Sequence, residues 1–345
     1  MNLPRAIHRA RAAVVDFVTF ELVNLIQHRH AAAAITPEGL EKSLAEWKGV
    51  PAEAFFAARD LPLELDAARP PDGRLSCPSP LPLGMERNDR FVCEFFPAGP
   101  AWDRPVMLLL HGLMSASAVG YRGWARRVNR EGWHAAFVHL PFHYDRCPSG
   151  HISGELAVSA DGARTVGGVR QAVVEIRGFI RTLLARGVPH VGCWGMSYGG
   201  WIGALLAVVE PAVRCAMLME PIVDFQHATW ESPATRSLRG HIGRGGVTRE
   251  MVAALDRLVS PATMRPTCDP ENIVLLAAEF DRIATPEVIE ALARAWGCPR
   301  YRCYPQGHVG YRLMREAFRE WRDELRPKLA KNLKPRITDA LDTSP

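Results

Sequence analysis

Short apolar runs alternate with longer amphipathic segments from about residue 91 onward. The apolar runs predict strands at residues 91–96, 106–110, 135–139, 188–194, 213–219, 273–278 and 300–304. Segments with apolar positions at helical spacing predict helices at 119–131, 163–186, 286–296 and 309–326. Because strands and helices alternate, we expect a mostly parallel central sheet covered by helices on both faces.

The N-terminal segment has a helical pattern of its own. Residues 4–33 predict one long helix whose apolar face comprises Val14, Phe17, Val18, Leu22, Leu25 and Ile26. Basic residues flank that face at Arg5, Arg9, Arg11, His28 and Arg29. Two interpretations are open: the helix packs on the domain body or a dimer partner, or it lies in a membrane interface. The acidic residues Asp16 and Glu21 argue against the second.

The remaining pattern divides the chain into three parts. A short helix begins at Thr36 and Pro37, and residues 60–90 are Pro-rich without periodicity, which indicates an ordered loop or linker. We therefore expect an N-terminal extension and linker over 1–89, an α/β domain over 90–327 and a tail over 328–345. More than fifty residues separate Met219 from Ile273, far more than a crossover needs, so we expect a lid at about 221–265.

Composition restricts the class of protein only mildly. A chain of 345 residues suits one large α/β domain with additions, or two domains. Its 48% hydrophobic and 23% charged residues are ordinary for a soluble globular protein. The formal net charge is +5, and basic and acidic residues are mixed along the chain, so no nucleic-acid partner is expected.

The eight cysteines include no C-x-x-C pair, which excludes zinc-ribbon and thioredoxin-like sites. Cys193, Cys215 and Cys303 fall in predicted strands and are expected to be small buried hydrophobes, as in a reducing compartment. Polar residues interrupt the N-terminal apolar stretch and argue against a secretory signal, at Asp16, Thr19, Glu21 and Asn24. No apolar run approaches the roughly 18 residues that span a bilayer, so we expect a cytoplasmic protein.

The most informative local motif is Gly195-Met196-Ser197-Tyr198-Gly199. It follows an apolar strand and precedes a nearly all-apolar helical stretch over 201–209. A G-x-S-x-G sequence at a strand-to-helix turn leaves the serine projecting above the end of the strand as a nucleophile. A Gly-rich turn with a solvated serine is the alternative, and the flanking strand and helix argue against it.

A serine nucleophile needs a base, and the base needs an orienting carboxylate. In this architecture the chain order is serine, acid, histidine, each at the carboxyl end of a strand. Asp281 follows the strand 273–278, and His308 comes 27 residues later, after the strand 300–304. Asp224, after the strand 213–219, is the alternative acid. The alternative for both Asp281 and His308 is a structural role, such as capping a helix.

An oxyanion hole requires two backbone N–H donors. One is expected from Tyr198, the residue after the nucleophile. The other is expected from the loop after the strand 106–110, with Leu113 preferred and Met114 second. The predicted substrate pocket is lined by His111, Gly112, Met114, Met196, Trp201 and Phe225.

Three histidines, His139, His143 and His151, cluster around Asp145. Imidazole and carboxylate groups suit several metals. However, Pro141 interrupts the helix that an i, i+4 pair of histidines needs, so a structural polar loop is the favoured interpretation. Neither a metal nor a cofactor is expected.

Across residues 90–327 the chain resembles the α/β-hydrolase superfamily. The likeness rests on the Gly195–Gly199 motif, the His111-Gly112 pair, Asp281 and Gly307-His308. The resemblance implies an α/β-hydrolase fold and cofactor-free ester hydrolysis by Ser197, Asp281 and His308.

A finer likeness concerns the order of segments along the chain. The Arg-rich first helix, Cys77-Pro78-Ser79-Pro80, Arg104-Pro105-Val106 and Val166-Gly167-Gly168 are similar to the subfamily of the eukaryotic abhydrolase domain-containing protein eighteen. That group implies deacylation of acyl esters or lipids. It favours Ser-Met-Gly-Gly where this chain has Ser197-Tyr198-Gly199-Gly200.

Three function classes follow. The leading hypothesis is a serine carboxylic-ester hydrolase acting on a small-molecule ester or lipid of moderate hydrophobicity. Thioester hydrolysis, amide hydrolysis and acyl transfer use the same residues, so they remain open. A non-catalytic ligand-binding module of the same fold is the third, because a fold does not dictate a function. The pattern predicts no particular oligomeric state.

Overall fold

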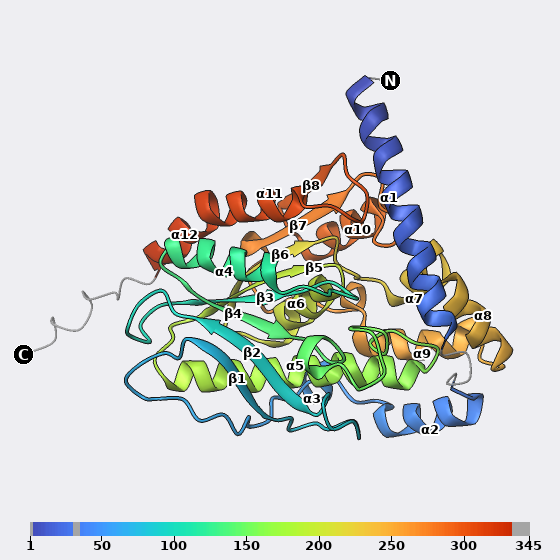
Figure 1. Cartoon of the computed structure of the whole chain (residues 1–345), viewed down its shortest axis with the longest axis horizontal. Helices are drawn as coiled ribbons and strands as arrows, with labels where there is room; N and C mark the ends of the chain where they lie inside the picture. The colour runs from blue at the N-terminus through green and yellow to red at the C-terminus, as the bar shows by residue number, and fades with distance from the viewer. Residues whose placement is uncertain (1–2, 30–34, 333–345) are drawn as a thin grey trace, which may run out of the picture.

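A computed structural model describes residues 3–29 and 35–332 of the chain (Figure 1). Its centre is an eight-stranded sheet in the order β1-β2-β4-β3-β5-β6-β7-β8. The strands are β1 (Gly73–Pro78), β2 (Arg90–Phe96), β3 (Val106–Leu110), β4 (His134–His139), β5 (Val191–Met196), β6 (Val213–Met219), β7 (Ile273–Ala278) and β8 (Arg300–Tyr304). The six strands β3 to β8 are mutually parallel. At one edge of the sheet, β2 runs antiparallel to both of its neighbours, β4 and the edge strand β1. The predicted mostly parallel sheet is confirmed.

Helices cover both faces of this sheet (Figure 1). One face packs against α5 (Gly162–Ala185), α6 (Tyr198–Val209) and α10 (Pro286–Trp296). The other packs against α4 (Val119–Arg130), α11 (Arg312–Glu320) and α12 (Arg326–Asn332). Successive strand residues point to opposite faces, so Leu108 and Leu110 join the first core while Met107 and Leu109 join the second. This two-sided burial explains why the strand sequences are continuously apolar.

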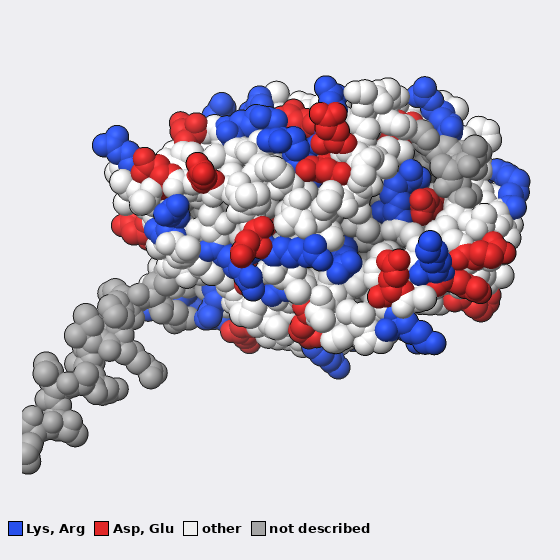
Figure 2. All heavy atoms as spheres, turned by 90° about the horizontal axis from the view of Figure 1, so that it is seen from below, with Lys and Arg blue, Asp and Glu red and all other residues white. Residues whose placement is uncertain are grey.

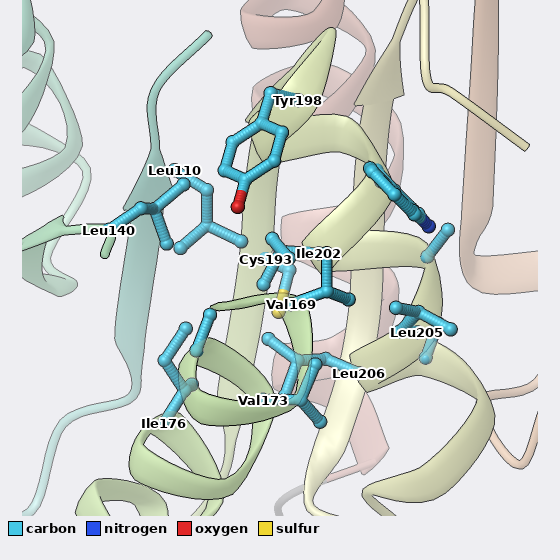
Figure 3. Packing of buried hydrophobic residues seen from close by; sticks show 14 of the residues in the cluster. Leu110, Leu140, Val169, Val173, Ile176, Cys193, Tyr198, Ile202, Leu205 and Leu206 are labelled. Atoms are coloured by element: carbon cyan, nitrogen blue, oxygen red, sulfur yellow. The ribbon is translucent and has the colours of Figure 1, made fainter. Parts of the chain in front are cut away.

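The core beneath the serine motif is drawn in Figure 3. Side chains from β3 and β5 meet those of α5 and α6, including Leu110, Cys193, Val169, Val173, Ile176, Ile202, Leu205 and Leu206. All residues of α6 are buried, as expected for a helix that is apolar all round. The ring of Tyr198 also points into this cluster. The first turn of α6, which follows Ser197, is therefore held rigidly against the sheet.

The N-terminal helix α1 (Leu3–His28) is confirmed as a helix that packs on the domain body, but through another face than the predicted apolar one. Of the predicted apolar face only Ile26 is buried, while the other five residues are exposed. The helix instead turns Phe20 and the polar residues Asp16, Asn24 and Gln27 toward the body. The periodicity identified the apolar side of the helix, but it did not predict which side of the helix packs on the domain. Residues 30–33 of the predicted helix lie outside the described residues.

The region predicted as a loop or linker contains a strand. Residues 73–78 form β1, which pairs antiparallel with β2 from Gly73↔Phe95 to Pro78↔Arg90. An edge strand need not show apolar alternation, and a proline at its end is tolerated there, so its sequence resembles a loop. Upstream, α2 (Pro37–Trp47) begins as predicted, with the Thr36 hydroxyl accepting from Gly39 N at 3.2 Å. The short α3 (Ala52–Phe55) follows.

The long interval between β6 and β7 is mostly helical. It holds α7 (Phe225–Trp230), η3 (Pro233–Thr235), α8 (Arg236–Arg244), α9 (Arg249–Val259) and η4 (Pro261–Thr263). Asn24 of α1 donates to Pro233 O and accepts from Ser237 N, each at 2.9 Å, and Glu21 pairs with Arg236 at 2.8 Å. The interval is thus tied to α1. The turn η5 (Pro270–Asn272) closes the interval directly before β7, and short helical turns elsewhere are η2 (Tyr144–Arg146) and η6 (Trp321–Leu325).

Three further predictions can be compared with the structure. All eight cysteines are free, and Cys193 and Cys215 are buried, but Cys303 is exposed because β8 is an edge strand. Within the described residues, no helix combines the length and apolarity needed to cross a bilayer. Of the predicted tail, α12 extends to Asn332, and residues 333–345 lie outside the described part.

The surface below α5 and α2 shows how charge is distributed over one face (Figure 2). Acidic and basic side chains are interspersed there, apart from a narrow row of basic ones across the middle. This mixture agrees with the mixed charge along the sequence. That the protein has no nucleic-acid partner stays a prediction.

Candidate active site

Ser197 occupies a sharp turn between β5 and α6. Its backbone has φ 53° and ψ −113°, and its N–H donates to Met219 O at 2.8 Å. A β-carbon at Gly195 would collide with the Gly199 carbonyl, and one at Gly199 would collide with the carbonyls of Leu110 and His111. A positive φ at a non-glycine residue costs about 1–3 kcal/mol and persists where the surroundings enforce it. The two glycines are therefore steric requirements of the turn that presents Ser197.

The structure brings together the three residues predicted as nucleophile, base and acid. His308 Nε2 lies 2.9 Å from Ser197 Oγ, and His308 Nδ1 lies 2.7 Å from Asp281 Oδ2. The second oxygen of Asp281 accepts from the N–H groups of Ile283 and Ala284 at 2.7 and 3.2 Å. The carboxylate is thus fixed by its own loop and turns one oxygen to the imidazole. These distances are the ones a Ser-His-Asp relay of hydrogen bonds requires.

The alternative acid Asp224, and Glu279 close to Asp281, are both engaged elsewhere. Asp224 caps α7 by accepting from His227 N at 2.8 Å. Glu279, at the end of β7, forms an ion pair with Arg5 of α1. Of the acids that the sequence offered, Asp281 is the one hydrogen-bonded to His308.

The imidazole of His308 sits among negative charges. Burial alone lowers its pKa, but the Asp281 carboxylate, together with Glu220 and Asp16, raises the pKa of His308 to about 9. Glu220 is fully buried, and burial raises the pKa of its carboxyl well above the ordinary value. Burial thus disfavours the charged form of Glu220, and Asp281 is the carboxylate that contributes most to the raised pKa of His308.

Glu220 is a site residue that the sequence reasoning missed. It directly follows β6, with φ 48°, and its Oε1 accepts from Gln306 Nε2 at 3.0 Å. Its Oε2 is buried without a hydrogen-bond partner among the described residues. The hydrogen bond between Gln306 and Glu220 joins the loop after β6 to the loop that carries His308. Its position one residue after a buried strand was the available signal, but of the acids after this strand only Asp224 was considered from the sequence.

Asp16 is the second missed residue. It lies on α1, yet its two carboxylate oxygens accept from the backbone N–H groups of His308 and Val309 at 2.9 and 3.0 Å. The side chain is buried, and any side chain at Gly307 would collide with it. Helix α1 therefore fastens the loop of His308. The available signal in the sequence was an acidic residue within a largely apolar helical stretch.

The expected oxyanion donors lie beside Ser197. Tyr198 is the first residue of α6, so its N–H has no partner within the helix. A β-carbon built on Gly112 would lie 3.8 Å from Ser197 Cβ, which places the 111–114 loop against the serine. Met114 N donates to His143 Nε2 at 3.2 Å, whereas Leu113 N has no partner among the described residues. The preference for Leu113 over Met114 stays a prediction, and these contacts favour it.

The predicted pocket residues differ in exposure. Met114 and Met196 are partly exposed, while Gly112 is buried beside Ser197. His111 is fully buried and bridges two loops through Gly112 O and Leu140 N, both at 3.0 Å. Trp201 donates to Val259 O and stacks on Phe225 inside the apolar core. A pocket-lining role for His111, Trp201 and Phe225 stays a prediction that their burial does not favour.

The histidine cluster and the site itself offer metal-type ligands. Both ring nitrogens of His143 are engaged, by Pro141 O and by Met114 N–H, as in a structural polar loop. In the described part of the chain, the acids and histidines that converge are Glu220, Asp281 and His308. Both nitrogens of His308 already bond Ser197 and Asp281. The donor set therefore fits a proton relay better than a metal centre.

Sequence comparison finds distant relatives. No family model matches the chain. Two uncharacterized proteins of Mycobacterium tuberculosis, from strains CDC 1551 / Oshkosh and ATCC 25618 / H37Rv, are each 27% identical over 214 residues. The match covers 60% of this chain and 50% of each relative, so the chain spans about half the length of the curated relatives it matches.

Solved structures match a larger share of the chain, at lower sequence identity. Acetyl xylan esterases from Thermoanaerobacterium sp. JW/SL YS485 and Paenibacillus sp. R4 superpose with TM-scores of 0.58 and 0.56, each at 15% identity. They cover 84% and 81% of this chain, and 94% and 93% of their own. A puromycin-hydrolyzing peptidase of Mycobacterium tuberculosis has a TM-score of 0.51 at 15% identity, covering 74% of this chain and 39% of its own. None of these comparisons supports the finer likeness to the abhydrolase domain-containing protein eighteen subfamily. Strand order, helix layers and these neighbours together show that the chain has the α/β-hydrolase fold.

Proposed function

We propose that this protein is a serine hydrolase that cleaves carboxylic esters through an acyl-enzyme intermediate. The observation that carries the proposal is the continuous hydrogen-bonded series from Ser197 Oγ through His308 to the buried carboxylate of Asp281. A solvated serine in a Gly-rich turn needs neither the imidazole nor the carboxylate.

In the first half-reaction, His308 Nε2 takes the proton of Ser197 as its oxygen attacks the acyl carbonyl carbon. The N–H groups of Tyr198 and Leu113 stabilise the oxyanion. Asp281 holds Nδ1–H and stabilises the imidazolium, which then protonates the leaving alcohol. In the second half-reaction, His308 activates a water, which attacks the acyl-serine ester and restores Ser197.

The substrate is proposed to be an acyl ester of moderate hydrophobicity. Leu113, Met114 and Met196, which lie beside Ser197 and are partly exposed, support an apolar acyl group. The esterase titles of the neighbouring structures agree with ester chemistry, whereas the peptidase title keeps amide hydrolysis open. Thioester hydrolysis, acyl transfer and lipid deacylation are further variants of the same mechanism. We also propose that the segment 221–265 acts as the lid, because it follows the carboxyl end of β6 directly and is bonded to α1. From the cysteine pattern we propose that the protein is cytoplasmic.

Turnover of short p-nitrophenyl esters tests the proposal. Ser197→Ala is expected to abolish turnover and labelling by a fluorophosphonate, with an unchanged melting temperature. Ser237→Ala, which changes a serine on α8, serves as the matched control and should retain both. Turnover that survives in Ser197→Ala would reject Ser197 as the nucleophile. A folded wild-type protein that is neither labelled nor active would favour the ligand-binding module.

A further inference from the structure

The outer side of α1 is an unusual surface for a globular protein. It exposes seven apolar side chains along one helix, those of Ile7, Val14, Val15, Phe17, Val18, Leu22 and Leu25. Phe17 is 63% and Leu25 is 65% exposed. The helix runs along the outside of the molecule (Figure 1). We call these seven residues the outer face of α1. Contiguous exposed apolar surface of this kind marks an interaction site.

Polar contacts hold α1 in this orientation. Arg5 pairs with Glu279, Asp16 accepts from the His308 loop, and Asn24 bonds Pro233 and Ser237. A surface helix normally turns its apolar stripe inward. Here the polar contacts turn most of the apolar side chains of α1 toward solvent. These side chains are therefore available for contact with another apolar medium.

A basic groove adjoins the outer face. The groove has a volume of about 620 Å³ and lies between α1 and the start of α11. Arg11 and Val15 line it from α1, and Arg312, Arg315 and Arg319 line it from α11. Arg319 pairs with Glu316, while the other three arginines have no carboxylate partner among the described residues. Apolar and cationic side chains therefore share one continuous surface.

We propose that the outer face of α1, together with Arg11, Arg312 and Arg315, docks on the surface of an anionic lipid bilayer. The apolar side chains would enter the boundary between headgroups and acyl chains, and the arginines would meet the lipid phosphates. This combination of apolar face and flanking cations is the one that binding to a charged interface uses.

A second copy of the chain fits this surface less well. Exposed basic residues lie at both ends of α1, with Arg5, Arg9 and Arg11 near its start and Arg29 directly after its end. Glu21, its partly exposed acid, is already paired with Arg236. Parallel or antiparallel pairing of two α1 helices therefore brings like charges together, which costs free energy. An anionic bilayer offers the opposite charge at every position.

Docking would also bring the loop that carries His308 close to the lipid surface. Gly307 and Val309 line the groove, and His308 lies between them. Asp16 joins the opposite side of the same helix to this loop. The backbone that carries the proposed base therefore borders the groove that contains the docking arginines.

Co-sedimentation with vesicles tests docking without relying on catalysis. The full chain carrying Ser197→Ala is mixed with phosphatidylcholine vesicles, with or without about one quarter phosphatidylglycerol, and binding is measured as salt is raised. We expect binding to the anionic vesicles that weakens at high salt. Phe17→Ser with Leu25→Ser should lower it at least tenfold. Arg312→Gln with Arg315→Gln should lower it about 25-fold, at about fivefold per charge.

Matched controls lie at the C-terminal end of α5 and its C-cap, outside the groove. Leu184→Ser removes an exposed apolar side chain, and Arg181→Gln with Arg186→Gln removes two charges, so both should bind as the parent does. Failure of the folded parent to bind either vesicle overturns the proposal. Equal, salt-insensitive binding to neutral vesicles overturns its anionic part. A dimer seen by ultracentrifugation that Phe17→Ser dissociates, without vesicle binding, assigns the surface to a second copy instead.

Discussion

The carboxyl ends of the parallel strands and helix α1 meet at His308, but different interactions hold the two regions in place. The strand ends are supported by apolar side chains buried on both faces of the sheet, and polar groups appear only where the strands stop. In α1 the polar side chains of Asp16, Asn24 and Gln27 face inward, and most of the apolar side chains face solvent. Burial of apolar surface therefore fixes Ser197 and Asp281, while hydrogen bonds and ion pairs attach α1. The comparison predicts that the two regions respond differently to substitution, pH and salt.

The largest effect is expected from the sheet side of the site. Asp281→Asn keeps the shape of the side chain but removes the charge that orients and stabilises the imidazolium. We expect kcat on a p-nitrophenyl ester to fall by about 10⁴-fold with little change in KM. Asp224→Asn is the matched control, because Asp224 only caps α7. If Asp224→Asn proves the more damaging of the two, the choice of acid is wrong.

Stability should separate the two regions next. Leu205→Ala removes a fully buried side chain of α6 and should lower the free energy of unfolding by about 2–5 kcal/mol. Phe17→Ser removes an exposed one from α1 and should change it by less than about 0.5 kcal/mol. Denaturant unfolding measures both values. A large loss in Phe17→Ser would show that its ring is buried in the folded protein.

The pH profile of catalysis reports the charges that both regions direct at His308. The pKa of His308 is raised to about 9, so at pH 7 the imidazole is mostly protonated and cannot accept the serine proton. We expect kcat/KM to rise about tenfold per unit from pH 7 and to level off above about 9. A profile already flat between pH 7 and 9 would mean that the carboxylates do not raise this pKa.

The contribution of α1 to the site is expected to be smaller and is tested through Asp16. Asp16→Asn removes a negative charge near His308 and one of two acceptors for its loop. We expect kcat to fall about tenfold to hundredfold through misplacement of the base, and the rise of kcat/KM to move to lower pH. Glu21→Gln, on the same helix but paired with Arg236, should leave the profile in place. A fall in kcat with no shift of the profile would limit Asp16 to a structural role.

Sequence reasoning reached the residues whose positions follow from the local chain. Ser197, Asp281 and His308 each follow a strand closely, and parallel strands end at one edge, so their convergence could be inferred without coordinates. The same reasoning missed β1, since an edge strand has no required apolar pattern. It missed Glu220 because many polar residues follow strands and the sequence does not say which one turns inward.

By itself, the sequence determined the parallel sheet, its two helix layers and the strained turn at Ser197, because periodicity and glycine spacing act within a few residues. Only the tertiary structure decided that α1 lies with Asp16 on the His308 loop and its outer face toward solvent. That contact joins residues 292 apart in the chain. Amphipathic periodicity marks two sides of a helix, but which side the domain accepts depends on the hydrogen-bond donors of a loop that the helix meets only after folding.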